Sequence, residues 1–299
     1  LERLLDGDAV DAQERHSELA AATSRLARGL AARARSGGLG FEALPGFGPR
    51  AGALALAGVL QAPYLATAHH HAGSRAGLRE IETAFFGPAL PPREPRALVF
   101  TDTLEEVNGV AGTMRRLAAA GAEGRLPLGV VAAGPRGRDG VLALEAEWTL
   151  PLPGYERVEL RFPSPTDVMA RLESDRPDLV HVATPGPVGL CGLLAAKLLG
   201  VPVVGSYHTQ LGPYALQLTR DLLVAEAFEW YVDWFYRQCA TVLAPTHTVA
   251  AALEKRGLAG RVRVWGRGVD AELFSPAHRC DTLRAALLDG GELLLLCVG

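Results

Sequence analysis

Short apolar runs alternate with amphipathic segments from residue 97 to residue 270. Each run is apolar on both faces and ends at turn-forming residues, which predicts a buried strand. The segments between the runs carry apolar residues at helical spacing. The predicted strands cover residues 97–102, 127–134, 158–163, 178–186, 201–207, 240–245 and 261–270. The predicted helices cover residues 107–121, 164–175, 187–200, 218–239 and 246–257.

This alternation is typical of an α/β fold, a doubly wound parallel sheet with helices on both faces. Pro187 at the first turn of one predicted helix and Gly200 after its last turn mark the limits of that helix. Ligands bind to such sheets outside the carboxyl ends of the strands. The residues that follow each strand are therefore the candidates for chemistry.

The first 95 residues have a different character. Residues 1–34 are rich in Ala, Leu, Glu and Arg and predict a helix, and residues 51–68 are apolar but interrupted by Pro63. We expect a buried or membrane-surface helix at 51–68, with a membrane span as the alternative. We expect residues 1–95 to form a helical accessory region or the tail of an upstream domain.

The expected α/β domain covers residues 96–275. Residues 276–299 are expected to form a linker and the first strand of a further domain. The sequence begins with Leu1 and ends in LLLLCVG, which favours a fragment of a longer protein.

Composition narrows the class of protein. The chain has 299 residues, is 48% hydrophobic and 21% charged, and carries a net charge of −3. A near-balanced charge without a basic stripe argues against a nucleic-acid partner. The four cysteines are widely spaced and form no CxxC pair, which is typical of buried thiols in a reducing cytosol.

Two strand ends carry groups suited to chemistry. Asn108, Gly109 and Val110 open the helix after the first strand, where free N–H groups suit a diphosphate; a glycine that merely permits a turn is the alternative. His208 follows the strand at 201–207 and could exchange a proton with a hydroxyl substrate or tie down backbone carbonyls. His181, inside a strand, is expected to be a hydrogen-bonded core histidine.

Other catalytic patterns are missing from the sequence. It has no GxSxG, HExxH, Walker or GxGxxG motif. His69, His70 and His71 are adjacent, and three adjacent helical residues cannot all face one ion. We therefore expect a solvated helix start there and no metal site.

Four stretches together resemble the retaining glycosyltransferases of family four, which have the GT-B fold. They are FTDTLEEVNGVAGTMRRLA, VHVATPGPVGLCGLLAAKLLGVPVVGSYHTQ, TVLAPTHTVAAALEKRG and RVRVWGRGVDAELFSP. They occur in the family's order over residues 97–299. The resemblance is strongest to bacterial members that move mannose or a related hexose onto a glycolipid.

The resemblance implies a role for each matching residue. Gly109 would lie against the donor diphosphate, in a loop shaped by Asn108 and Val110. His208 would be the catalytic histidine, with Tyr207 and Thr209 as its acceptor-side neighbours. Arg267 and Asp270 would mark the crossing into the second domain. The chain would then be the N-terminal, acceptor-side Rossmann-like half of the enzyme.

The resemblance also implies an activity. The enzyme would transfer a hexose from a GDP- or UDP-sugar, as substrate rather than bound cofactor, to a lipid or glycan acceptor with retention. It would work in the cytoplasm at the inner membrane face, with peripheral membrane contact. Because the donor-side elements lie beyond Gly299 in the family, this chain alone is expected to be inactive. The alternative is a metal-dependent phosphoesterase remnant in residues 1–95 fused to a non-catalytic glycan- or lipid-binding module.

Overall fold

The computed structural model describes residues 94–134, 140–152, 155–208 and 220–288, together with 216–217, 293–295 and a few scattered residues between 25 and 85. The chain divides into two compact units between Trp265 and Gly266, and each is described by itself. The division predicted after residue 275 stays a prediction.

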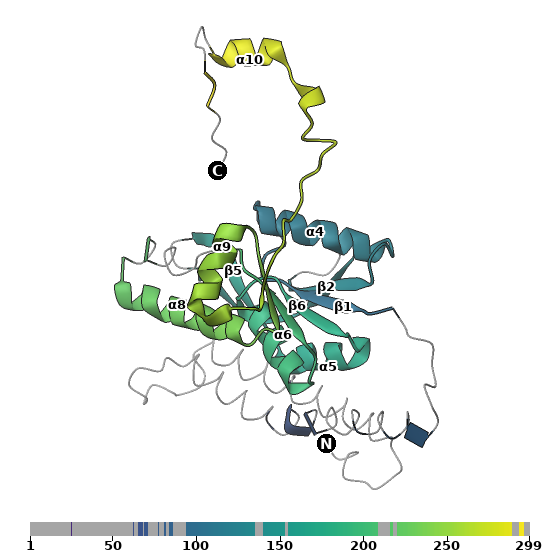
Figure 1. The fold of residues 1–299 in the computed structure, drawn as a ribbon. Helices are drawn as coiled ribbons and strands as arrows, with labels where there is room; N and C mark the ends of the chain where they lie inside the picture. Colours follow the sequence, from purple (N-terminus) through teal and green to yellow (C-terminus); the bar gives the residue numbers. More distant parts are fainter. Residues whose placement is uncertain are drawn as a thin grey trace. The chain divides into compact units, whose positions relative to one another are not determined.

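The first unit contains a seven-stranded sheet in which every pair of neighbouring strands is parallel (Figure 1). The strand order is β3-β2-β1-β6-β7-β8-β9. The strands are β1 (Ala97–Phe100), β2 (Leu128–Ala133), β3 (Val141–Leu144), β6 (Leu179–Val182), β7 (Val203–Ser206), β8 (Thr241–Ala244) and β9 (Val262–Val264). The predicted α/β class with a parallel sheet is confirmed.

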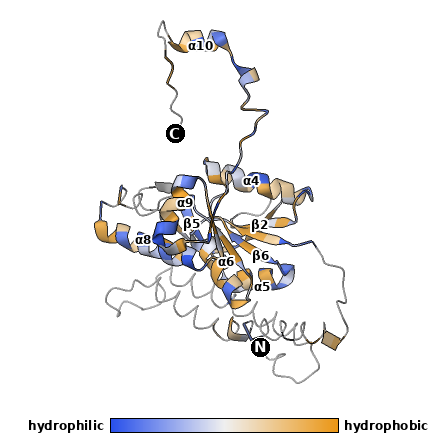
Figure 2. Cartoon of the chain, viewed as in Figure 1, coloured by the Kyte–Doolittle hydropathy of each residue, from blue (hydrophilic) through white to orange (hydrophobic). Residues whose placement is uncertain are grey.

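Helices cover both faces of this sheet. In Figure 1, α4 lies on one side of the sheet and α5 and α6 lie on the other. The helices are α4 (Gly109–Ala122), α5 (Pro165–Asp175), α6 (Pro187–Leu198), α8 (Leu222–Arg237) and α9 (His247–Leu253), which η1 (Glu254–Leu258) extends. Figure 2 shows β2 and β6 in the colours of hydrophobic residues, as expected for strands buried on both faces.

The strand residues alternate between two hydrophobic clusters. Leu98 and Phe100 belong to the larger cluster with Leu193 of α6, whereas Val99 belongs to the smaller cluster with Met114 of α4. Successive side chains of a strand point to opposite faces, so each face of β1 packs against its own helix. The alternation also sets which side chains can meet at the site.

Residues 158–163 form a strand, but they do not join the parallel sheet as predicted. They are part of β5 (Tyr155–Pro163), which pairs antiparallel with β4 (Ala146–Leu152) in a separate two-stranded sheet. Two residues connect β4 to β5, and a connection this short permits only antiparallel pairing because parallel neighbours need a long crossover. β3 and β4 were not predicted from the sequence.

The predicted limits of α6 are confirmed. Pro187 is its first residue, and Gly200 adopts a left-handed backbone with φ +68° beyond its end. The N–H of Val201 donates to the Ala196 carbonyl at 2.8 Å, which is the backbone pattern of a glycine-terminated helix.

The last strand is shorter than predicted. β9 ends at Val264, and Gly268 has φ +72°, a conformation that does not continue a strand. In the second unit, Asp270 Oδ1 accepts from the backbone N–H groups of Glu272 and Leu273 at 3.1 and 2.9 Å. This unit also contains η2 (Pro276–His278) and α10 (Asp281–Leu288). Most of the strand expected at the end of the chain lies outside the described residues.

Most of residues 1–93 lies outside the described part of the chain, including most of the predicted helices at 1–34 and 51–68. The residues described there, such as Leu65 and His69, are helical. Leu65 packs against the larger core cluster, and His69 Nδ1 lies 2.6 Å from the Leu198 carbonyl oxygen at the end of α6. Among the described residues, no helix is both long and apolar enough to cross a membrane.

Candidate functional site

The reversal of strand order lies between β1 and β6. The strands on one side of β1 run β2, β3, and those on the other run β6, β7, β8, β9. In doubly wound sheets the crevice at this reversal, beyond the carboxyl ends of the strands, is the usual ligand site. Residues 101–109 follow β1 into this crevice, and residues 183–187 follow β6.

Asp102 lies two residues after β1 and caps the N-terminus of α6. Its Oδ2 accepts from Thr184 Oγ1 at 2.7 Å and from the N–H groups of Gly186 and Gly189 at 3.1 and 3.2 Å. Its Oδ1 accepts from the Val188 N–H at 2.6 Å. Burial raises the pKa of the Asp102 carboxyl to about 6, and these hydrogen bonds limit the rise. The Asp102 carboxylate therefore occupies the N-terminus of α6, the positive end of the helix dipole, where an anionic ligand would otherwise be stabilised.

Glycines make this capping possible. A Cβ on Gly186 would lie 2.5 Å from the Asp102 carboxyl carbon, and a Cβ on Gly189 would overlap the Thr184 carbonyl oxygen. The sequence TPGPVG thus lets the carboxylate approach the helix backbone. The close approach joins the ends of β1 and β6.

The loop after β1 leads to the N-terminus of α4. Asn108 is the N-cap, and its Oδ1 accepts from the Ala111 N–H at 2.8 Å while its Nδ2 donates to Thr103 Oγ1 at 3.0 Å. Thr103 Oγ1 donates to Glu106 Oε2 at 2.6 Å, and the Arg115 guanidinium donates to carbonyl oxygens of the same loop. These hydrogen bonds fix the loop before any ligand is present.

The first-turn N–H groups of a helix have no acceptor within the helix. The Asn108 side chain takes the N–H of Ala111, and Gly109 and Val110 stand at the first two positions of α4. Asn108 and Gly109 are exposed and Val110 is half-buried. The three residues thus lie together at a helix N-terminus that can receive an anion.

A second group lies beyond β6 and β7, where two histidines share one face of the sheet. His181 Nε2 lies 2.7 Å from Ser206 Oγ, and the His181 side chain is buried. Burial lowers the pKa of His181 to about 4, so its ring is neutral at physiological pH. The prediction that His181 is a hydrogen-bonded core histidine is confirmed.

His208 follows β7 on the same side as Ser206. His208 as a whole is half-buried and both of its ring nitrogens are buried; its ring centroid lies 6.4 Å from that of Trp265 at an interplanar angle of 47°. The Trp265 indole also lies 5.8 Å from His181, edge to face at 70°. His208 is thus held over the carboxyl edge of the sheet beside an aromatic ring.

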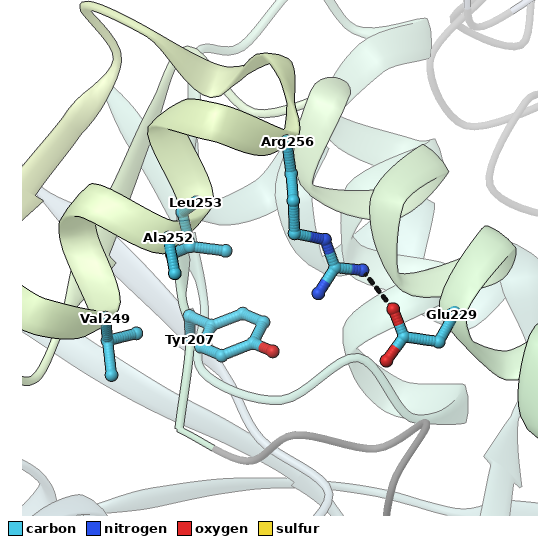
Figure 3. A pocket seen from close by; sticks show the side chains of 6 residues that line it. All are labelled: Tyr207, Glu229, Val249, Ala252, Leu253 and Arg256. Atoms are coloured by element: carbon cyan, nitrogen blue, oxygen red, sulfur yellow. Dashed lines mark hydrogen bonds and ion pairs between the residues drawn. The ribbon is translucent and has the colours of Figure 1, made fainter.

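Tyr207 faces the opposite side from His208. Its ring lies 5.3 Å from that of Tyr236 in α8, and it lines a pocket of about 170 Å³ with Val249, Ala252 and Leu253. Figure 3 shows its hydroxyl pointing toward the Arg256–Glu229 ion pair.

Arg256 closes this pocket on its polar side. Its Nη2 lies 2.6 Å from Glu229 Oε2 and 2.7 Å from Asp233 Oδ1, so η1 is tied to α8. Burial is the largest of the effects that raise the pKa of Tyr207. The structure thus places the Tyr207 ring between α8 and α9 rather than beside the His208 imidazole. Its predicted acceptor-side role stays a prediction.

The remaining candidates lie partly outside the described residues. Thr209 and His71 are among the residues that the structure does not describe. His69 and His70 are exposed and helical. In the described part of the chain, no group of three or more His, Cys, Asp or Glu side chains could hold a metal ion.

Sequence reasoning missed Asp102, Thr184, Ser206 and Trp265. The sequence VFTD contains a signal for Asp102, since it places a carboxylate two residues after the end of the buried strand β1. Its partners lie 82 to 87 residues away along the chain, so local patterns could not identify them. Trp265 lies near His208 because β9 and β7 are close together in the sheet, and a single sequence does not reveal this strand order.

The part of the chain that carries this site matches the sequence model of a known protein family. The model of Glycosyltransferase Family 4 matches residues 107–273, from the loop before α4 to beyond β9. The chain belongs to this family. The match covers more than half of the chain and includes Asn108, Gly109, Val110 and His208.

Curated proteins of similar sequence carry glycosyltransferase names. A GDP-mannose-dependent alpha-mannosyltransferase of Mycobacterium tuberculosis is 35% identical over 136 residues, 45% of this chain and 35% of that protein. A sulfoquinovosyl transferase of Arabidopsis thaliana is 30% identical over 144 residues, 48% of this chain and 28% of that protein. A D-inositol 3-phosphate glycosyltransferase of Nocardiopsis dassonvillei is 37% identical over 133 residues, 44% of this chain and 31% of that protein. The chain therefore spans about a third of the length of these relatives.

Proposed function

We propose that this chain forms the acceptor-side half of a retaining hexosyltransferase. The full-length enzyme would transfer mannose or a related hexose from a GDP- or UDP-sugar to a lipid or glycan acceptor. Membership of Glycosyltransferase Family 4 supports the reaction type. The name of the similar protein from Mycobacterium tuberculosis, a GDP-mannose-dependent alpha-mannosyltransferase, supports a nucleotide-sugar donor.

One observation carries this proposal. The N-terminus of α4, which follows β1, and His208, which follows β7, lie at the same edge of the sheet with β6 between their strands. Neighbouring strands are about 4.8 Å apart, so the two strand ends are separated by about 10 Å. The helix that follows β1 and the histidine that follows β7 would then face one crevice, with the phosphates of a sugar diphosphate toward α4 and its reacting sugar toward His208.

The N-terminus of α4 and His208 would have different roles in the reaction. The N–H groups of Gly109 and Val110 would hold the diphosphate and stabilise the charge that develops on it as the sugar departs. His208 would hydrogen-bond a hydroxyl of the sugar or the acceptor and fix the reacting groups in place. Asp102 would keep the second helix N-terminus of the crevice occupied, so that the anion is directed to α4.

The exposed face of α8 supports a lipid acceptor. Leu222, Leu223 and Trp230 are 61, 76 and 70% exposed on this helix, and Figure 2 shows α8 with both hydrophobic and hydrophilic residues. An amphipathic helix with an exposed tryptophan suits the interface of a bilayer. We place the enzyme in the cytoplasm, at the inner face of the membrane, in peripheral contact through α8.

The test is a screen of nucleotide-sugar donors and of lipid and glycan acceptors on the full-length protein. We expect one donor to support transfer, with the anomeric configuration retained in the product. A Gly109→Val variant should raise the KM for that donor at least tenfold, because a side chain would block the approach of the diphosphate. The control is Gly112→Ala in the same helix, where an added Cβ lies 3.9 Å from the Arg115 guanidinium. An unchanged donor KM in Gly109→Val would contradict the diphosphate assignment, and inversion of the anomeric centre would contradict the reaction class.

A further inference from the structure

Trp265 has a fixed place at the edge of the sheet. Its backbone N–H donates to the Ala244 carbonyl at 2.8 Å and so continues the β8–β9 ladder one residue beyond β9. It is the last residue of the first unit. The indole is therefore anchored to the same sheet that carries His208.

The indole meets both histidines of the site. Its centroid lies 5.8 Å from His181 and 6.4 Å from His208. His181 is held in turn by its 2.7 Å hydrogen bond to Ser206 Oγ. The indole thus stands between the His181 ring, which is buried and hydrogen-bonded, and the His208 ring, whose two nitrogens are buried.

The peptide before His208 is also fixed. The Ser206 carbonyl accepts from the Tyr236 hydroxyl at 2.7 Å, and the Tyr207 N–H donates to the Leu243 carbonyl at 2.8 Å. The backbone therefore sets where His208 starts, but it leaves the rotation of the imidazole about its χ angles open. The Trp265 ring is the aromatic neighbour that can limit this rotation.

We propose that Trp265 is a positioning residue for His208, holding its imidazole in the orientation that the transfer reaction requires. This inference rests on the proposed function of His208. A flat, rigid indole limits the imidazole to fewer rotamers, and a small displacement of a reacting group can cost about a hundredfold in rate. Trp265 acts through His208 and needs no contact with the substrate.

The test compares Trp265→Leu with Trp265→Phe in the full-length protein. Leucine removes the aromatic face, whereas phenylalanine keeps one. We expect Trp265→Leu to lower kcat at least tenfold with the donor KM within about threefold of wild type, and Trp265→Phe to recover most of the loss. Val264→Ala is the control, because it alters the adjacent residue of β9 on the opposite face. A merely structural role would change the melting temperature without separating kcat from KM.

A second measurement does not depend on activity. The ring-proton resonances of His208, assigned by their loss in His208→Ala, should move in Trp265→Leu because the indole's ring current is removed. Unmoved His208 resonances, or a wild-type kcat in Trp265→Leu alongside an inactive His208→Ala, would overturn the proposal. If His208→Ala keeps full activity, the function proposed for His208 fails, and the resonances alone decide whether Trp265 positions its ring.

Discussion

The His181 imidazole lies 2.7 Å from the Ser206 hydroxyl, and this contact joins β6 to β7 two residues before His208. Burial lowers the pKa of His181 to about 4 from an ordinary 6.5. Between these two pH values the ring stays neutral in the folded protein but takes up a proton in the unfolded chain. The stability that neutral His181 provides is therefore full above pH 6.5 and is lost as the pH falls toward 4.

The first prediction concerns this pH dependence. Relative to a His181→Gln variant, which cannot titrate, we expect the wild type to lose about 3 kcal/mol of unfolding free energy between pH 7 and pH 4. Urea unfolding at a series of pH values measures this difference. His247→Gln, at an exposed position, should follow the wild type. Parallel stability curves for the wild type and His181→Gln would show that His181 titrates normally.

The second prediction concerns the cap on α6. An Asp102→Ala variant leaves the N–H groups of Gly186, Val188 and Gly189 without their carboxylate acceptor. Each hydrogen bond to a charged group contributes about 1.5–3 kcal/mol, partly replaced by water after truncation, so we expect a net loss of about 3 kcal/mol. Denaturant unfolding measures it against Glu254→Ala, an exposed carboxylate. A loss below about 0.5 kcal/mol, the usual range for a surface change, would exclude the capping role.

The third prediction concerns the glycine that permits this cap. A Gly189→Ala variant would drive a methyl group into the Thr184 carbonyl, and we expect it to lower the unfolding free energy by at least about 2 kcal/mol. Gly112→Ala, in the interior of α4, should instead be neutral or stabilising by about 0.5–1 kcal/mol. Melting temperatures of the two variants give the comparison. Equal melting temperatures would mean that the α6 backbone yields easily at this position.

The elements predicted from the sequence are those whose pattern is local. The apolar runs that became β1, β2, β6, β7 and β8 were identified to within a few residues, because burial on both faces leaves a continuous apolar stretch. The local sequence pattern did not predict the partner of β5. Its alternation of apolar and polar residues is compatible both with an antiparallel two-stranded ribbon and with an outer strand of the parallel sheet. The partner of a strand depends on tertiary contacts that a single sequence does not display.

The roles predicted for the site residues stay predictions, but their places in the fold could be predicted in part from the sequence. His208 lies two residues after β7, and Gly109 begins the helix that follows β1, so their positions in the sequence already indicate which edge of the sheet they occupy. The partners of Asp102 and Trp265 lie on other strands and helices, so they depend on the strand order. Tyr207 and His208 point to opposite faces of the sheet because successive side chains along a strand alternate. The predicted acceptor-side role of Thr209 falls on a residue outside those the structure describes.

The fourth prediction concerns the ion pairs behind Tyr207. Arg256→Met removes the contacts of 2.6 and 2.7 Å to Glu229 and Asp233. These side chains are about one third exposed, so solvent weakens the pairs, and we expect a loss of about 1 kcal/mol that shrinks in 1 M salt. Arg279→Met is the control, because it removes a pair with Asp281 whose side chains are 66 and 77% exposed. A loss that is independent of salt would point to packing of the arginine stem instead.

The most direct test of the central claim is the transfer rate of His208→Ala in the full-length protein, with the donor and acceptor that the screen identifies. We expect kcat to fall by about a hundredfold or more, as for the loss of a positioned acid or base. His247→Ala, an exposed histidine outside the site, should keep the wild-type rate. A kcat for His208→Ala within about tenfold of wild type, with both variants folded, would contradict the assignment of His208 as the catalytic histidine.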